Sequence, residues 1–156
     1  MKLLLLETGE EIEAAIVEVE EADYAQIKKS KQFVFDWDQE KGNHVFKIII
    51  ADEGTTPLIH GLLSLTDRAD EFRIHINLIE SSNDNKSPNK KIDRVAGCLL
   101  SFAVQVAFEK GYFGFTSLIP KTMLIPIYVE KYGFSQYGNQ LAIEGKAAIQ
   151  LIQQYQ

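Results

Sequence analysis

The chain has 156 residues, of which 46% are apolar and 24% are charged, and its formal net charge is −6 at pH 7. This length and composition predict a soluble globular protein with a single domain spanning residues 1–156. An acidic chain is a poor general nucleic-acid binder, because a phosphate backbone needs a basic face. We therefore expect no nucleic-acid partner.

Cysteine and histidine usage excludes several kinds of site. Cys98 is the only cysteine, so an intramolecular disulfide and a cysteine zinc cluster are both excluded. The three histidines are scattered without the spacing of metal ligands, so no metal site is expected. The apolar run at residues 3–6 is too short for a signal peptide or a membrane span. A cytoplasmic protein without a membrane partner is the resulting prediction.

The first half of the chain predicts mostly strands. A strand is expected at residues 14–19, followed by a short helix at 20–30 whose two lysines suit its C-terminal end. Three β-like runs separated by short, turn-rich segments then predict an antiparallel meander. A fourth strand follows, in which apolar residues alternate. These four runs cover residues 32–38, 44–52, 57–67 and 72–80.

The second half predicts helices alternating with strands. Residues 81–93 form a polar loop, longer than most connections in a compact domain, and such loops are commonly functional. A long apolar helix is then expected from residue 94 until Gly111 closes it. Further strands and helices follow: a strand at 113–120, a helix at 122–134, a strand at 139–145 and a helix at 146–156.

This order of elements defines a fold class. An antiparallel meander that leads into one strand–long helix–strand unit predicts an α+β fold with a mostly antiparallel central sheet flanked by helices. The strand–helix–strand unit is expected to be a right-handed parallel crossover. The sheet then contains one point where the pairing direction changes, and crevices at such points commonly bind ligands.

Residues 89–97, NKKIDRVAG, place three cations around a helix start, where the helix dipole already favours an anion. Together with GCLLSFAVQVAFEKGY after it and IYVEKYGF at 127–134, this segment resembles the GNAT superfamily of N-acetyltransferases, including a subset of small bacterial members. The family's pyrophosphate motif, (Gln/Arg)-x-x-Gly-x-(Gly/Ala), aligns Lys91 with its first position, Arg94 with its first glycine and Ala96 with its last position. The resemblance is clearest from about residue 77 to residue 145.

The resemblance implies acetyl-CoA as the co-substrate. The first helical turn would offer the backbone N–H groups of Arg94, Val95, Ala96 and Gly97 to the pyrophosphate, and Lys91 could add a charge-assisted bond. In the family, pantetheine lies between two splayed strands, and a backbone N–H group holds the acetyl carbonyl. Leu78 and Ile79 take that position here.

The resemblance also implies direct transfer of acetyl to a primary amine. Glu80, at the end of the predicted fourth strand, is the expected proton acceptor, and Tyr128 is the expected proton donor to the leaving thiolate. Tyr128 lies one residue further from the following Gly-Phe pair than the usual family tyrosine, a spacing that the small bacterial subset shares.

Alternatives remain open at this point. The replaced motif glycine and the displaced tyrosine also suit a catalytically inactive GNAT-fold module that binds CoA or another protein, or a domain that binds no CoA. The acceptor is expected to be a small-molecule or peptide amine that the sequence does not identify. A homodimer is compatible with the resemblance and is not required by it.

Overall fold

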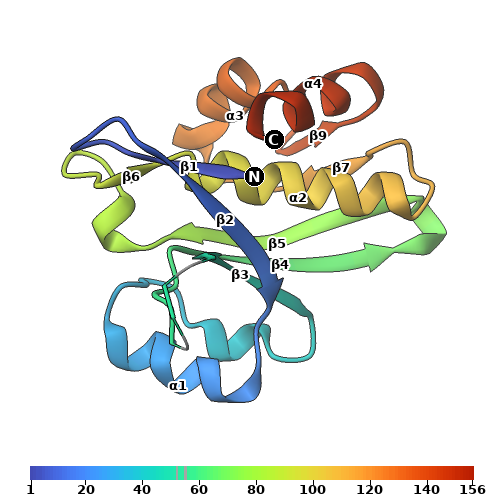
Figure 1. Cartoon of the computed structure of the whole chain (residues 1–156). Helices are drawn as coiled ribbons and strands as arrows, with labels where there is room; N and C mark the ends of the chain where they lie inside the picture. The colour runs from blue at the N-terminus through green and yellow to red at the C-terminus, as the bar shows by residue number, and fades with distance from the viewer. Residues whose placement is uncertain (52, 55) are drawn as a thin grey trace. The chain divides into compact units, whose positions relative to one another are not determined.

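The chain divides into two compact units. Figure 1 shows the helices and strands of the whole chain. A computed structural model describes residues 1–51, 53–54 and 56–156. The first unit comprises Met1–Ser64 and Leu78–Leu99, and the second comprises Leu65–Asn77 and Leu100–Gln156. Three elements contribute residues to both units: β4 (Gly61–Arg68), β5 (Arg73–Ser81) and α2 (Val95–Glu109).

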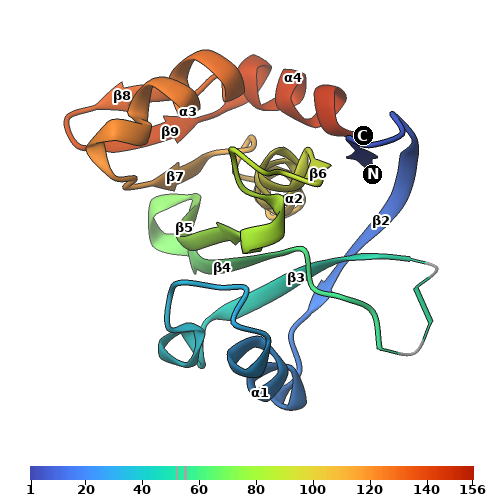
Figure 2. The same cartoon turned by 90° about the vertical axis from the view of Figure 1, so that its left-hand side faces the viewer.

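The first unit is built on antiparallel pairing at the start of the chain. Its own strands are β1 (Lys2–Leu5), β2 (Glu11–Glu18), β3 (His44–Ile50) and β6 (Ile92–Asp93). Hydrogen-bonded neighbours follow the order β6-β1-β2-β3-β4-β5, and β1 pairs antiparallel with both β2 and β6. Helix α1 (Glu21–Ser30) lies beside β3 (Figure 2). A buried cluster in this unit comprises Ile27, Trp37, Val45, Ile59 and Leu62.

The second unit contains the parallel pair. Its own elements are β7 (Thr116–Leu118), α3 (Ile125–Tyr132), β8 (Ser135–Tyr137), β9 (Gln140–Ile143) and α4 (Gly145–Tyr155). Strand β7 pairs parallel with β5, and β9 pairs antiparallel with β7 and β8. Helix α2 connects β5 to β7 in sequence. The predicted fold class, a mostly antiparallel mixed sheet with helices and one parallel crossover, is confirmed.

Most predicted elements exist, and one is wrong. The alternating aromatic residues at 32–38 predicted a strand, but this stretch is irregular and ends in the 3₁₀ helix η1 (Trp37–Glu40). The backbone N–H groups of Val34 and Phe35 donate to a side chain, Glu80, where a strand would donate to a neighbouring strand. The meander at this point is therefore shorter than predicted. Strands β1, β6 and β8 were not predicted.

Short 3₁₀ helices occupy several connections. Besides η1, they are η2 (Ala69–Glu71), η3 (Asn83–Asn85) and η4 (Thr122–Leu124). Helix α3 begins with Pro126 in its first turn, where a missing N–H group costs nothing, and it ends at Gly133, whose φ of 85° is the left-handed conformation typical of helix ends. Within the described residues, no helix has both the length and the apolar character needed to cross a membrane.

Candidate functional site

Helix α2 starts at the residues where the aligned motif predicted a helix start. Residue Arg94 has a φ of 78°, in the left-handed region that glycine adopts most readily. The helix begins at Val95, and the N–H group of Cys98 donates to the carbonyl oxygen of Arg94 at 2.9 Å. The N–H groups of Val95, Ala96 and Gly97 precede this bond, in the turn whose N–H groups have no intrahelical acceptor. This turn is therefore suited to binding an anion.

The same helix start is attached to β1 through one carbonyl group. Arg94 Nε donates to the Lys2 carbonyl oxygen at 3.0 Å, and the Cys98 thiol donates to the same oxygen at 3.6 Å. Cys98 is fully buried, and this burial raises the pKa of its thiol to about 11. Nothing in the sequence indicated that β1 would support the helix start.

Two lysines lie immediately before the helix start. Lys90 Nζ contacts Asp93 Oδ1 at 3.1 Å, whereas Lys91 Nζ lies 3.8 Å from Asp84 Oδ2 with its side chain 72% exposed. The Lys91 backbone is fixed, since its N–H group donates to the Asp84 carbonyl and its own carbonyl accepts from Leu6. Lys91 thus combines a fixed backbone with an exposed ammonium group. Both lysines line a cavity of about 980 Å³ in the first unit.

A buried polar cluster that the sequence did not reveal holds the chain just before these residues. Asn85 Nδ2 donates to Ser82 Oγ at 2.8 Å and lies 3.1 Å from His60 Nδ1, while Asn85 Oδ1 accepts from the Ile92 N–H group at 3.2 Å. Because the Asn85 amide group is a donor toward His60, Nδ1 is the acceptor and the ring proton lies on Nε2. Burial lowers the pKa of His60, which favours this neutral form. The cluster fixes the approach to the helix start.

The end of β5 carries the other predicted residues of the first unit. Leu78 and Ile79 are half-buried, and Leu78 packs against the buried cluster of this unit. Glu80 is 4% exposed. Its Oε1 accepts from Trp37 Nε1 at 2.9 Å and from the Phe35 N–H group at 3.2 Å.

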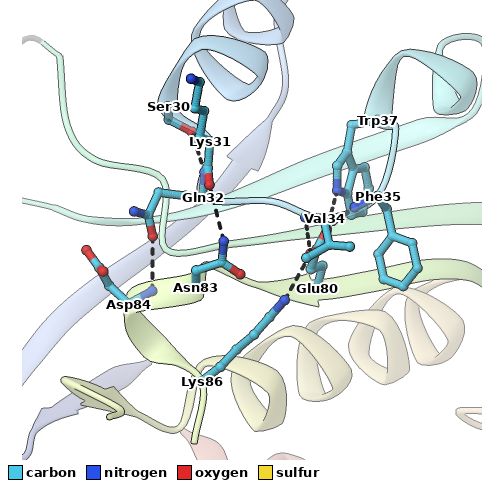
Figure 3. A network of polar contacts seen from close by, with 10 residues as sticks. All are labelled: Ser30, Lys31, Gln32, Val34, Phe35, Trp37, Glu80, Asn83, Asp84 and Lys86. Carbon is cyan, nitrogen blue, oxygen red and sulfur yellow. Dashed lines mark hydrogen bonds and ion pairs between the residues drawn. The ribbon is translucent and has the colours of Figure 1, made fainter.

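The second carboxylate oxygen of Glu80 is also bonded. Oε2 accepts from the Val34 N–H group at 2.6 Å and from Lys86 Nζ at 3.0 Å (Figure 3). An ionised carboxylate has about four lone-pair positions, and four donors are aligned with them here. This full set of bonds favours a structural role for the carboxylate over proton acceptance.

Tyr128 belongs to the second unit. It lies in the middle of α3 and is half-buried, with its ring centroid 5.9 Å from that of Tyr132 and 5.8 Å from that of Phe134. Burial raises the pKa of Tyr128 above its ordinary value of 10. The phenol therefore keeps its proton at neutral pH, as a proton donor must.

Comparisons with known proteins define the fold. No family model matches the sequence, and no curated protein matches it either. Solved structures do match. The ribosomal-protein-S18-alanine N-acetyltransferase from Escherichia coli has a TM-score of 0.61 at 12% identity, covering 85% of this chain and 94% of that chain.

Two further structures agree with the first. A chimera of the spermidine N-acetyltransferase SpeG from Vibrio cholerae and hSSAT has a TM-score of 0.64 at 11% identity, covering 87% of this chain and 98% of that chain. The NatC complex bound to Gag peptide and CoA has a TM-score of 0.55 at 13% identity, and the match covers 85% of this chain and 99% of that chain. The chain therefore shares its fold with these structures, and this agrees with the GNAT-like fold that the resemblance implied.

Proposed function

We propose that the chain is an acetyl-CoA-dependent N-acetyltransferase that transfers the acetyl group directly to a primary amine. The observation that carries the proposal is the left-handed backbone at Arg94, directly before the long helix α2. Arg94 is the residue aligned with the motif's first glycine, and a residue with a side chain rarely adopts this conformation. The shared fold supports the proposal at a coarser level.

The chain's own groups have separate proposed tasks. The N–H groups of residues 94–97, at the positive end of α2, bind the pyrophosphate, and the small side chains of Ala96 and Gly97 allow it to approach the backbone. The exposed Lys91 adds a charge-assisted bond. The N–H groups of Leu78 and Ile79 are proposed to orient the thioester carbonyl.

The co-substrate supplies an activated acetyl thioester. In the transfer, the amine nitrogen forms a bond to the acetyl carbon, the carbon–sulfur bond breaks, and the amine loses a proton. We assign Tyr128 as the donor of a proton to the departing sulfur, as the resemblance implies, and a phenol is protonated at neutral pH. The sequence predicted Glu80 as the acceptor of the amine proton, but its four hydrogen bonds do not favour that role, so the amine proton passes to solvent water.

Calorimetry with acetyl-CoA tests the proposal. We expect saturable binding with a dissociation constant in the micromolar range or below, and we expect Lys91→Ala to weaken it about tenfold, as the loss of one charge-assisted bond would. Lys29→Ala, at the exposed end of α1, is the matched control and should leave the affinity unchanged. Absence of binding at high micromolar acetyl-CoA would refute the proposal.

Tyr128→Phe tests the chemical step. Loss of a positioned proton donor should lower turnover by about 100-fold with little change in acetyl-CoA affinity. Tyr137→Phe is the matched control, because Tyr137 is 64% exposed on β8. Equal turnover in the wild type and Tyr128→Phe would remove this assignment.

The alternative function is a GNAT-fold module that binds CoA without transferring acetyl. The bonded state of the Glu80 carboxylate favours it, because such a carboxylate is poorly suited to accept a proton. Binding of acetyl-CoA with no transfer across a broad amine panel would establish this alternative over the enzyme.

A further inference from the structure

The connection after α1 is attached to the end of β5 at two places. Nearer to α1, the Asn83 N–H group donates to the Gln32 carbonyl at 2.8 Å, and Asn83 Nδ2 donates to the Lys31 carbonyl at 3.2 Å. The Asp84 N–H group donates to Gln32 Oε1 at 3.0 Å. The second attachment is the Glu80 carboxylate, which holds Val34, Phe35 and Trp37 (Figure 3). Between them, these bonds fix residues 31–37 along residues 80–86.

The segment at residues 33–37 combines a buried anchor with an exposed apolar surface. Trp37 is 2% exposed and belongs to the buried cluster of the first unit. Val34, by contrast, is 74% exposed, and Phe35 is 39% exposed. The backbone of both residues is nevertheless fixed, because each N–H group donates to the buried carboxylate. Exposed apolar side chains on a fixed backbone are suited to contact a ligand.

Protonation of Glu80 would disturb this arrangement. A protonated carboxyl group carries an O–H donor, and here it would face N–H donors. At least one of the four hydrogen bonds would be lost in each cycle of proton transfer. Lys86 Nζ supplies one of these four bonds, to Oε2 at 3.0 Å.

We propose that Glu80 is a positioning residue. Its carboxylate holds the 33–37 segment next to Leu78, which packs against the same buried cluster as Phe33 and is proposed to orient the thioester carbonyl. Val34 and Phe35 thereby present an apolar contact surface to the acceptor amine. The acceptor class that this surface fits is a primary amine carrying an apolar or aromatic group. The proposal rests on the proposed N-acetyltransferase function for the acceptor, whereas the holding of the segment is testable without any activity.

Trp37 provides a direct measurement, because it is the only tryptophan in the chain and its indole N–H group donates to Glu80. Glu80→Gln keeps the side-chain shape but turns an amide NH₂ group toward N–H donors. We expect a red-shifted Trp37 emission and stronger quenching by acrylamide. Amide hydrogen exchange at Val34 and Phe35 should quicken about tenfold or more, as the loss of a hydrogen bond would allow. Unchanged emission and exchange would overturn the proposal.

A second variant keeps the proposal testable if Glu80→Gln fails to fold. Lys86→Met removes one donor and keeps the carboxylate, so its emission and exchange should change in the same direction by a smaller amount. Both variants should bind acetyl-CoA within about threefold of the wild type, since the helix start is not altered. If the wild type itself binds no acetyl-CoA, the proposed function fails, while the emission and exchange results still decide whether Glu80 holds the segment.

Kinetics separate positioning from proton acceptance. Phenethylamine and ethylamine are the probes, since they differ by an aromatic group. We expect the wild type to prefer phenethylamine, Phe35→Ser to lose that preference, and Glu80→Gln to raise KM for phenethylamine more than it lowers kcat. A fall in kcat of about 100-fold or more with unchanged KM and unchanged Trp37 emission would make Glu80 the proton acceptor and overturn the proposal.

Discussion

The end of β5 and the start of α2 lie at opposite ends of one connection, residues 82–94, and are held by different means. At the strand end, a buried ionised carboxylate accepts four hydrogen bonds from other segments. At the helix start, a neutral backbone carbonyl, that of Lys2, accepts from two side chains of the helix start itself. The strand end thus depends on a side chain that one substitution can remove, whereas the helix start depends on a backbone carbonyl that every residue carries.

The contrast has an energetic consequence. Removing the partner of buried charged or polar groups leaves them unsatisfied, which costs far more than losing a partly exposed hydrogen bond. We therefore expect large effects from substitutions at the strand end and smaller ones at the helix start.

The largest expected effect is that of Glu80→Ala. It removes the acceptor of the Val34, Phe35, Trp37 and Lys86 groups at once, so the free energy of unfolding should fall by about 3–5 kcal/mol. Denaturant unfolding followed by far-UV circular dichroism measures it independently of Trp37. Glu11→Ala is the control, because its ion pair with Lys2 is exposed and should contribute less than about 1 kcal/mol. Similar losses of unfolding free energy in Glu80→Ala and Glu11→Ala would contradict the expectation that the strand end is especially sensitive to substitution.

The next effect concerns pH at the helix start. The pKa of Cys98 is raised from 9.0 to about 11 by burial, so the folded state binds the thiol proton more tightly than the unfolded state does. Stability from this group is present below pH 9 and is lost as pH rises toward 11, by about 2 kcal/mol.

Other groups also ionise in that range, so the measurement is the difference between wild type and Cys98→Ala in unfolding free energy from pH 8 to pH 11. The wild type should lose stability more steeply with rising pH. Parallel curves would show that Cys98 does not titrate in this way.

The two regions also differ in how far the sequence predicted them. The motif alignment identified the helix start and the position of Arg94, because local spacing determines where a helix begins. The bonds of Glu80 were not predictable in the same way. Its partners Val34, Phe35 and Trp37 lie 43 to 46 residues away in sequence, and two of them donate through backbone N–H groups that every residue except proline carries.

The strand wrongly predicted at residues 32–38 is also explained by the long-range bonds of Glu80. Alternating aromatic residues normally mark a strand with one buried face. Here Trp37 is buried, but Phe35 is partly exposed, because the carboxylate of Glu80 supplies the hydrogen bonds that a neighbouring strand would have supplied. Hydrogen bonds between residues that are far apart in sequence can outweigh a local strand pattern, and the spacing of neighbouring residues does not reveal them.

The smallest expected effect is the difference in stability between Arg94→Ala and Arg94→Gly, which separates the contribution of the Arg94 backbone conformation from that of its side chain. A left-handed conformation costs a non-glycine residue about 1–2 kcal/mol, and Arg94 has this conformation at a φ of 78°. Arg94→Ala loses the bond to Lys2 and keeps the strain, whereas Arg94→Gly loses the bond but relieves the strain. Glycine also adds freedom to the unfolded chain, so Arg94→Gly should be about as stable as the wild type and about 1 kcal/mol more stable than Arg94→Ala.

Binding of acetyl-CoA to the same two variants then decides which part of Arg94 matters. If the pyrophosphate is held by backbone N–H groups, as proposed, Arg94→Gly keeps the affinity within about threefold, because glycine retains the N–H group and favours the same φ. A loss of about tenfold or more in both variants would show that the guanidinium binds the phosphate directly. Either result leaves the four bonds of Glu80 in place, because their donors are Val34, Phe35, Trp37 and Lys86. The helix start can therefore be altered one group at a time, whereas substitution of Glu80 affects four groups at once.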